Sequence, residues 1–195
     1  MMELSDKELS VIENTSFLLT KRKVTEKIQQ LLGQTRLDLK ALLSRNVFEF
    51  PEGSDLITGK ISKGENYQNL PYLVLDYPRL FTQKDIFAYR TMFWWGNFFS
   101  ATLHLQGQSL DKHRSALIKN LPGLIDQDIY IGVGSSPWQY HYETDNYIPV
   151  SEIDADFIRQ CEFLKLSKKI PLSQWSQVPQ FSTDFLAFLI ALLGA

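Results

Sequence analysis

The sequence predicts an α+β fold, in which a mainly antiparallel sheet packs with N-terminal helices and an apolar C-terminal helix. Three observations support this fold class. Apolar residues recur at helical spacing over the first 45 positions, residues 85–106 alternate as a strand does, and residues 184–193 are apolar almost all round. The predicted strands follow one another without regular helical crossovers, which favours α+β over α/β.

Composition limits the classes of protein to consider. A chain of 195 residues with 44% hydrophobic residues predicts a single domain, 1–195, with a helical segment at 1–48 and a sheet-based body at 55–195. A net charge of −2 makes nucleic acid an unexpected partner. The single cysteine, Cys161, excludes an internal disulfide and fits a reducing compartment. The N-terminus lacks an apolar leader, and 185–195 is too short to span a bilayer, so we expect a soluble, cytoplasmic protein without a membrane partner.

The first third of the chain is predicted to be helical. Ser5 and Glu8 form the S-x-x-E pattern of a capping box, which predicts a helix that begins there. A second helix is indicated by four apolar residues at i, i+4, i+7 and i+8: Val24, Ile28, Leu31 and Leu32. Gly33 is placed to end it, and a third short helix would then run to about Arg45.

The centre of the chain is predicted to form strands. We expect strands at 57–62 and 72–77, with a polar loop between them and Pro78 ending the second. In residues 85–106, the odd positions from Phe87 to Leu105 are nearly all apolar, whereas the even positions are mixed. This alternation predicts one face against the core and one face that is only partly covered. Gly96 indicates either a bend in one long strand or a hairpin near Gly96 and Asn97.

The last third is predicted to mix helices and strands. We expect a helix at 110–121, a hairpin of strands at 129–133 and 138–143, and a helix that begins after Ser151. Residues 164–172 fit a strand or an irregular edge. Ser182 or Thr183 is expected to cap a final helix over 184–193. Because that helix is apolar nearly all round, it must be buried either in the core of this chain or against a second subunit, and we favour the core.

One group of residues suggests a ligand site on the even face of 85–106. An arginine-rich aromatic surface could bind a small anionic aromatic ligand, and a carboxylate among aromatics could act as a base. The candidate ligand-binding residues are Asp76, Arg79, Arg90, Trp94, Phe98 and His104. Two alternatives remain open: an Asp–Arg salt bridge that satisfies both groups, and a helix that covers this face.

Catalytic and metal signatures are weak in this chain. His104, His141 and Glu143 are candidates for a two-His-one-carboxylate site, but a short H-x-E pattern occurs often by chance. The chain has no G-x-S-x-G, HExxH, CxxC or Walker pattern, so the sequence assigns no catalytic residue and leaves open whether the protein is an enzyme, and we predict no metal and no cofactor.

Charge is unevenly distributed along the chain. Residues 20–45 hold seven basic and two acidic residues, whereas residues 123–162 hold one basic and eight acidic residues. These regions are either solvated faces or surfaces that pair within the chain, between copies or with another protein.

Two hypotheses for function follow. The favoured one is a non-enzymatic interaction or self-association module that forms a homo-oligomer or binds a protein partner. The alternative is a small-molecule-binding protein or enzyme with a pocket over the Arg90, Trp94, Phe98 and His104 face.

Overall fold

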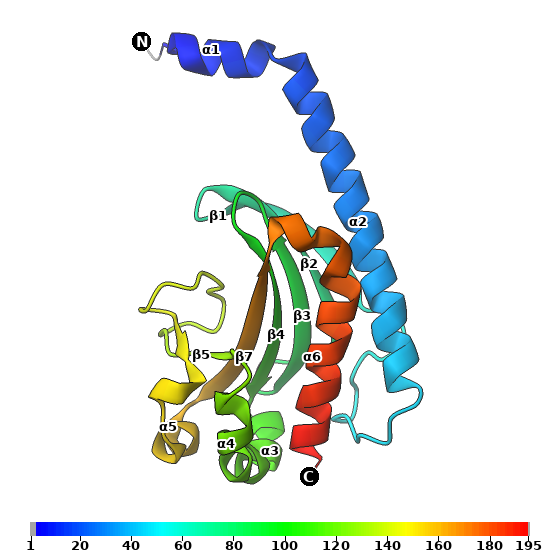
Figure 1. The fold of residues 1–195 in the computed structure, drawn as a ribbon, viewed down its shortest axis with the longest axis vertical. Helices are drawn as coiled ribbons and strands as arrows, with labels where there is room; N and C mark the ends of the chain where they lie inside the picture. The colour runs from blue at the N-terminus through cyan, green and yellow to red at the C-terminus, as the bar shows by residue number, and fades with distance from the viewer. Residues whose placement is uncertain (1–2, 195) are drawn as a thin grey trace.

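The computed structural model describes residues 3–194, which form a seven-stranded antiparallel sheet with helices, as the α+β prediction requires (Figure 1). The strand order is β1-β2-β3-β4-β7-β5-β6. The strands are β1 (Lys60–Tyr67), β2 (Leu70–Phe81), β3 (Ile86–Trp94), β4 (Phe98–Gln106), β5 (Tyr130–Gly132), β6 (Tyr147–Pro149) and β7 (Phe163–Pro171). The helices are α1 (Asp6–Glu13), α2 (Thr15–Leu43), α3 (Gln108–Lys119), α4 (Leu121–Ile125), α5 (Ala155–Gln160) and α6 (Val178–Leu193), with 3₁₀ turns η1 (Val150–Glu152) and η2 (Leu172–Gln177).

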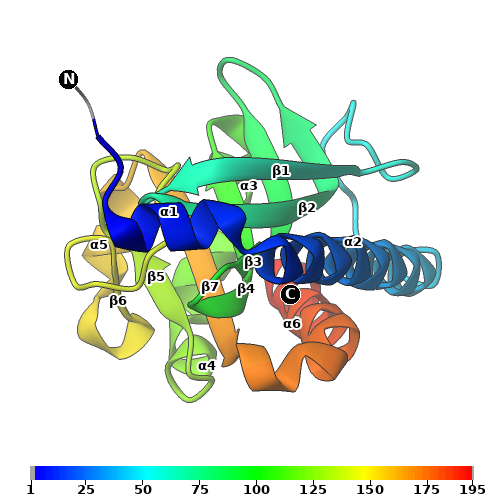
Figure 2. The ribbon, with the colours of Figure 1, turned by 90° about the horizontal axis from the view of Figure 1, so that it is seen from above.

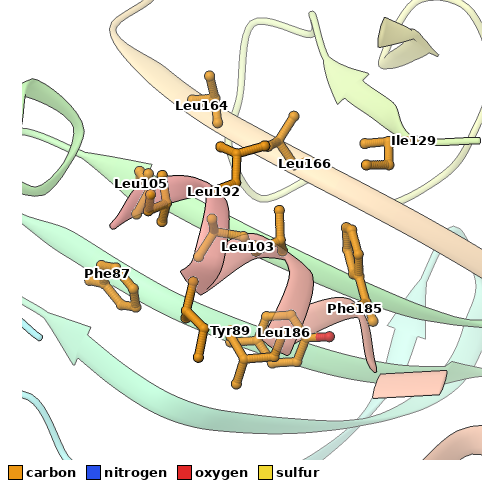
Figure 3. Packing of buried hydrophobic residues seen from close by; sticks show 14 of the residues in the cluster. Phe87, Tyr89, Leu103, Leu105, Ile129, Leu164, Leu166, Phe185, Leu186 and Leu192 are labelled. Carbon is orange, nitrogen blue, oxygen red and sulfur yellow. The ribbon is translucent and has the colours of Figure 1, made fainter. Parts of the chain in front are cut away.

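One face of the sheet carries the main hydrophobic core and is here called the apolar face. Odd-numbered residues of β3 and β4, including Phe87, Tyr89 and Leu103, pack there against α6 (Figure 3). Helix α2 lies along α6 and also contacts β2, so the two helices cover this face side by side (Figures 1 and 2). The expectation that the apolar C-terminal helix enters the core is therefore confirmed. It starts earlier than expected, at Val178, and neither Ser182 nor Thr183 caps it.

The aromatic segment is a hairpin and not one bent strand. β3 pairs with β4, and the turn at Trp95–Asn97 is closed by a hydrogen bond from Asn97 N to Trp94 O of 3.1 Å. Gly96 has φ +73°, a left-handed conformation that suits glycine, so this residue permits the turn.

The N-terminal helices differ from the prediction. The Ser5 capping box is present and begins α1. Gly33 does not end a helix, because α2 continues through it to Leu43. The buried residues of α2 stay in phase on both sides of the glycine: Ile28, Leu32, Thr35 and Leu39. Their packing outweighs the cost of a mid-helix glycine, which is about 1 kcal/mol.

Two strand boundaries were also wrong. The residues expected to form a polar loop at 63–69 are mostly strand β1, and the turn lies at Gln68 and Asn69, which both have positive φ. Strand β2 continues through Pro78 to Phe81. Pro78 lies in a register shift between Asp76 and Arg79, where its missing N–H breaks no regular ladder bond.

The predicted hairpin of 129–133 with 138–143 is not formed. β5 pairs instead with β6 and β7, and residues 138–143 are an irregular segment. Tyr140 and His141 of that segment are buried. Two consecutive buried side chains do not fit the alternation of a strand, so the polarity pattern of residues 138–143 did not reflect their burial.

Candidate functional site

The second face of the sheet, here called the polar face, carries a row of polar side chains across four strands. Three cross-strand pairs form this row. Asp76 on β2 pairs with Arg90 on β3, Arg90 pairs with Thr102 on β4, and Thr102 pairs with Ser167 on β7. Asp76, Thr102 and Ser167 are buried. This row follows from alternation, because the residues next to each of these positions point to the opposite face.

Asp76 and Arg90 form a bidentate ion pair at the centre of this row. Arg90 Nε donates to Asp76 Oδ1 at 2.7 Å, and Nη2 donates to Oδ2 at 2.8 Å. Arg90 Nη1 also donates to the hydroxyl of Tyr140. Burial alone would lower the pKa of Arg90, but the hydrogen bonds to Asp76 raise that pKa above its ordinary value. The Asp–Arg salt bridge that the sequence left open is present.

Lys165 on β7 is a buried amine beside this pair. Its side chain is 0% exposed, and its Nζ donates to the carbonyl of Gln139 and lies 4.6 Å from the ring centre of Tyr147. Among residues 3–194 it forms no ion pair. Burial and the nearby Arg90 lower the pKa of Lys165 to about 7. The polar face therefore holds one buried amine, one partly buried guanidinium and one buried carboxylate.

His104 is the cross-strand partner of Lys165 and is also buried. Burial, together with the charges of Lys165 and Arg90, lowers the pKa of His104 to about 3, so its ring is neutral. Its Nε2 atom has no hydrogen-bond partner among the described residues. The ring stacks edge-on against Trp138, with 5.6 Å between ring centres.

Residues 133–146, here called the cover segment, close the polar face, where the sequence left open a covering helix. Tyr67 on β1 anchors this segment, because its hydroxyl accepts from Tyr140 N at 2.6 Å and from His141 N at 3.1 Å. The same hydroxyl bonds His141 Nδ1 at 2.8 Å. The segment leaves a cavity of about 160 Å³ lined by Tyr67, Tyr72, Val74, Arg90, Met92, Trp138 and Tyr140.

The six residues proposed from the sequence as ligand-binding are only partly brought together. Arg90 lines the cavity, with Asp76 bound to it. Trp94 and Phe98 pack against each other with ring centres 5.5 Å apart. Arg79 lies apart from them and pairs with Asp55 at 3.3 Å. His104 is not among the lining residues. The site residues stay a prediction, since no ligand contact tests them.

The three weak candidates for metal ligands, His104, His141 and Glu143, do not share a site. His104 lies against Trp138, whereas His141 bonds Tyr67 and approaches Asp145, with 3.3 Å between Nε2 and Oδ1. Glu143 is exposed. Within residues 3–194, no three His, Cys, Asp or Glu side chains are grouped as a metal site requires.

The second candidate region is the N-terminal arm, defined here as residues 3–20. The arm comprises α1 and the start of α2 and projects beyond the sheet (Figures 1 and 2). Every one of its residues is exposed. Seven are large and apolar, with exposed fractions between 43% and 60%: Leu4, Leu9, Val11, Ile12, Phe17, Leu18 and Leu19. Sequence reasoning placed the helix here but did not detect that its apolar side has no covering element.

The basic and acidic regions of the chain lie far apart. α2 lies by β1 and β2, whereas β5, β6 and α5 lie towards the opposite edge of the sheet (Figure 1). Among residues 3–194, no ion pair joins residues 20–45 to residues 123–162. The intramolecular pairing considered from the sequence is therefore not formed by side chains of these two regions.

No family model matches this chain, and neither a curated protein nor a solved structure matches it. In the described part of the chain, no helix combines the length and apolar character needed to cross a membrane.

Proposed function

We propose that this protein is a non-enzymatic self-association module and that the N-terminal arm is its interaction surface. The observation that supports this proposal is that every residue from 3 to 20 is exposed, although seven of them are large and apolar. Seven large exposed apolar side chains in one segment exceed the single scattered ones that are ordinary on a protein surface, and such a concentration is typical of protein interaction sites.

The energetics of the arm favour a partner. Burying a Leu, Ile or Phe side chain contributes about 1.5–3 kcal/mol, so covering several of the arm's residues would outweigh the ordering cost of the helix. Helix α1 has only eight residues, and a helix that short is marginal in water without tertiary packing. A partner would supply that packing.

The charges of the chain favour a second copy as that partner. Residues 3–13 hold four acidic residues and one basic residue, Lys7. Residues 21–27 hold four basic residues and one acidic residue, Glu26. Two copies related by a two-fold axis can place the acidic segment of each chain against the basic segment of the other. A self-complementary patch of this kind is what an isologous dimer requires.

We place the association surface on the arm and not on the C-terminal helix. Leu186 and Leu189 of α6 are 0% exposed within this chain, so deletion of residues 183–195 would disrupt the core before it changed any interface. The support for self-association therefore comes from the exposed arm and the charge asymmetry, and not from the C-terminal helix.

The test is the oligomeric state of the full-length protein by multi-angle light scattering. We expect a dimer for the native sequence and a monomer for the double variant Leu9→Ser/Ile12→Ser. Leu37→Ser is the matched control, because Leu37 is 54% exposed but lies on α2 outside the arm. Circular dichroism should show that all three proteins are folded. A monomeric native protein at high micromolar concentration would refute the proposal.

The ligand-binding alternative has less support. The charge of Arg90 is already matched by Asp76, so the cavity of about 160 Å³ lacks a free cation at its wall. The observation in its favour is Lys165, which carries no ion pair in the described chain. Thermal shift with small carboxylates such as benzoate tests it: stabilisation of the native protein that is lost in Lys165→Met would support an anion site.

A further inference from the structure

An apolar groove lies where α2 meets the sheet, below the N-terminal arm. Its volume is about 330 Å³, and its rim includes Lys27 and Trp175, the latter 46% exposed. It is formed by one side of α2, the β3–β4 turn region and η2, and it is lined by Val24, Lys27, Ile28, Phe93, Trp95, Phe99, Leu172 and Trp175.

We infer that this groove receives α1 of a second copy, so that two copies exchange their arms reciprocally. The inference rests on the proposed self-association and specifies where the arm binds. It makes the site in each copy incomplete without the other.

The groove is not filled by α1 of its own chain. Val24 lies ten residues after Asn14, the N-cap of α2, and the helix between them separates the end of α1 from the groove. At 1.5 Å per residue, this helix holds the two about 15 Å apart. Because α1 turns away from α2 at Asn14 and does not line the groove, the groove is open to a helix from another molecule.

The apolar side of α2 is continuous from the groove into the arm. Phe17 and Val24 are seven residues apart and therefore lie on the same side of α2, two turns from each other. Val24 lines the groove, whereas Phe17 lies above it and is 51% exposed. Phe17 thus extends the apolar surface of the groove, and an entering helix would cover both.

The chemistry of α1 fits this groove. Leu4 and Leu9 occupy the two positions of a hydrophobic staple around the Ser5 cap, and Ile12 follows one turn after Leu9. Asp6 and Glu13 lie three residues before and four residues after Leu9, so both are next to Leu9 on the same side of α1, and both are exposed. An amphipathic helix with an acidic flank matches an apolar groove whose rim carries Lys27. Aromatic side chains such as Trp175 are the residues that most often dominate binding energy at interfaces.

The first experiment measures the dimer dissociation constant by sedimentation or light scattering of the full-length chain. Trp175→Ala is expected to raise this constant about tenfold or more. The matched control is Trp138→Ala, because Trp138 is 50% exposed but lies on the cover segment, so this variant should leave the constant unchanged.

A charge exchange tests the orientation. Glu13→Lys and Lys27→Glu should each weaken the dimer, and the two changes together in one chain should restore it, at low ionic strength. Glu52→Lys is the control for the same change of charge at an exposed site outside the arm. If the double variant is no stronger than either single variant, Glu13 does not face Lys27 and this orientation is wrong.

Disulfide trapping tests proximity directly. In a Cys161→Ser background, chains with Leu9→Cys are mixed with chains with Trp175→Cys and oxidised. We expect a disulfide-linked heterodimer, and none when Trp138→Cys replaces Trp175→Cys.

The outcomes separate this inference from the proposal beneath it. If the Leu9→Ser/Ile12→Ser variant dissociates but Trp175→Ala associates as the native protein does and no crosslink forms, the arm binds elsewhere and the groove is excluded. If neither variant changes the oligomeric state, self-association through the arm is itself refuted.

Discussion

The two faces of the sheet are built from the same strands but are covered in different ways. The apolar face is closed by helix α6 and contains leucine, phenylalanine and tyrosine side chains. The polar face is closed by the irregular cover segment and contains Asp76, Arg90 and Lys165. A helix satisfies its own backbone and can bury an apolar stripe, whereas a coil needs polar partners for its backbone groups. The polar side chains of this face supply those partners.

The largest effect should come from breaking the ion pair on the polar face. Arg90→Met leaves the Asp76 carboxylate buried without its partner and is expected to lower the free energy of unfolding by about 3–5 kcal/mol. The double variant Asp76→Leu/Arg90→Met should recover most of this loss, because it removes both charges. Urea denaturation measures both. If the double variant is as unstable as the single one, the loss of Arg90 does not act through Asp76.

The corresponding change on the apolar face is Leu103→Ala, which removes a side chain that is 0% exposed. We expect a loss of about 2–5 kcal/mol from lost burial and the cavity left behind. Unlike Arg90→Met, this loss should not be recovered by a second substitution across the strand pair, because it does not leave an unpaired charge. Urea denaturation of Leu103→Ala at several pH values should also show the same loss throughout.

The polar face should make stability depend on pH. The pKa of Lys165 is about 7 in the folded protein and near 10.5 when unfolded, so only the unfolded state holds this proton between those values. Unfolding then takes up a proton, and stability should rise with pH by about 1 kcal/mol per pH unit from pH 7 to pH 9. The cost of burying the amine is greatest below pH 7. Lys165→Met should flatten this rise, as measured by urea denaturation across that range.

A smaller effect is expected at the anchor of the cover segment. Tyr67→Phe removes the acceptor for the backbone N–H groups of Tyr140 and His141, which should cost about 1–3 kcal/mol. Hydrogen exchange should accelerate in residues 133–146 more than in β3 or β4. Equal acceleration in the strands would mean that the segment does not open on its own.

The smallest effect concerns α2, the outer helix on the apolar side. Gly33→Ala is expected to stabilise the protein by about 0.5–1 kcal/mol, since alanine is the better helix former and a Cβ at this site meets nothing within 4 Å. Thermal denaturation is the measurement. A destabilised variant would show that the glycine is required for packing.

The elements with strong local signals were predicted well. The Ser5 capping box, the alternation of residues 86–106 and the apolar C-terminal helix all indicate the elements that are present. The errors arose where one local pattern fits two structures. Gly33 can end a helix or be carried through one, and the alternation of residues 138–143 fits a strand or a coil lying on a sheet.

The candidate sites depended on distant contacts and were predicted less completely. Asp76 and Arg90 were named as neighbours, and their register across β2 and β3 brings them together. Lys165 was missed, although it stands between the buried Leu164 and Leu166 in a predicted strand, so alternation assigns it to the opposite face. Its importance depends on the cover segment, which no local pattern indicates.

The sequence by itself determined the helices and strands that have strong local signals and which side of each is apolar, because these properties arise from neighbours along the chain. Only the tertiary structure decided which apolar sides find a covering surface. Residues of α2 from Val24 onwards meet α6 and the sheet. Residues 3–20 have the same helical character but extend past the end of the sheet. Burial requires a second surface, and the position of that surface is set by the whole fold.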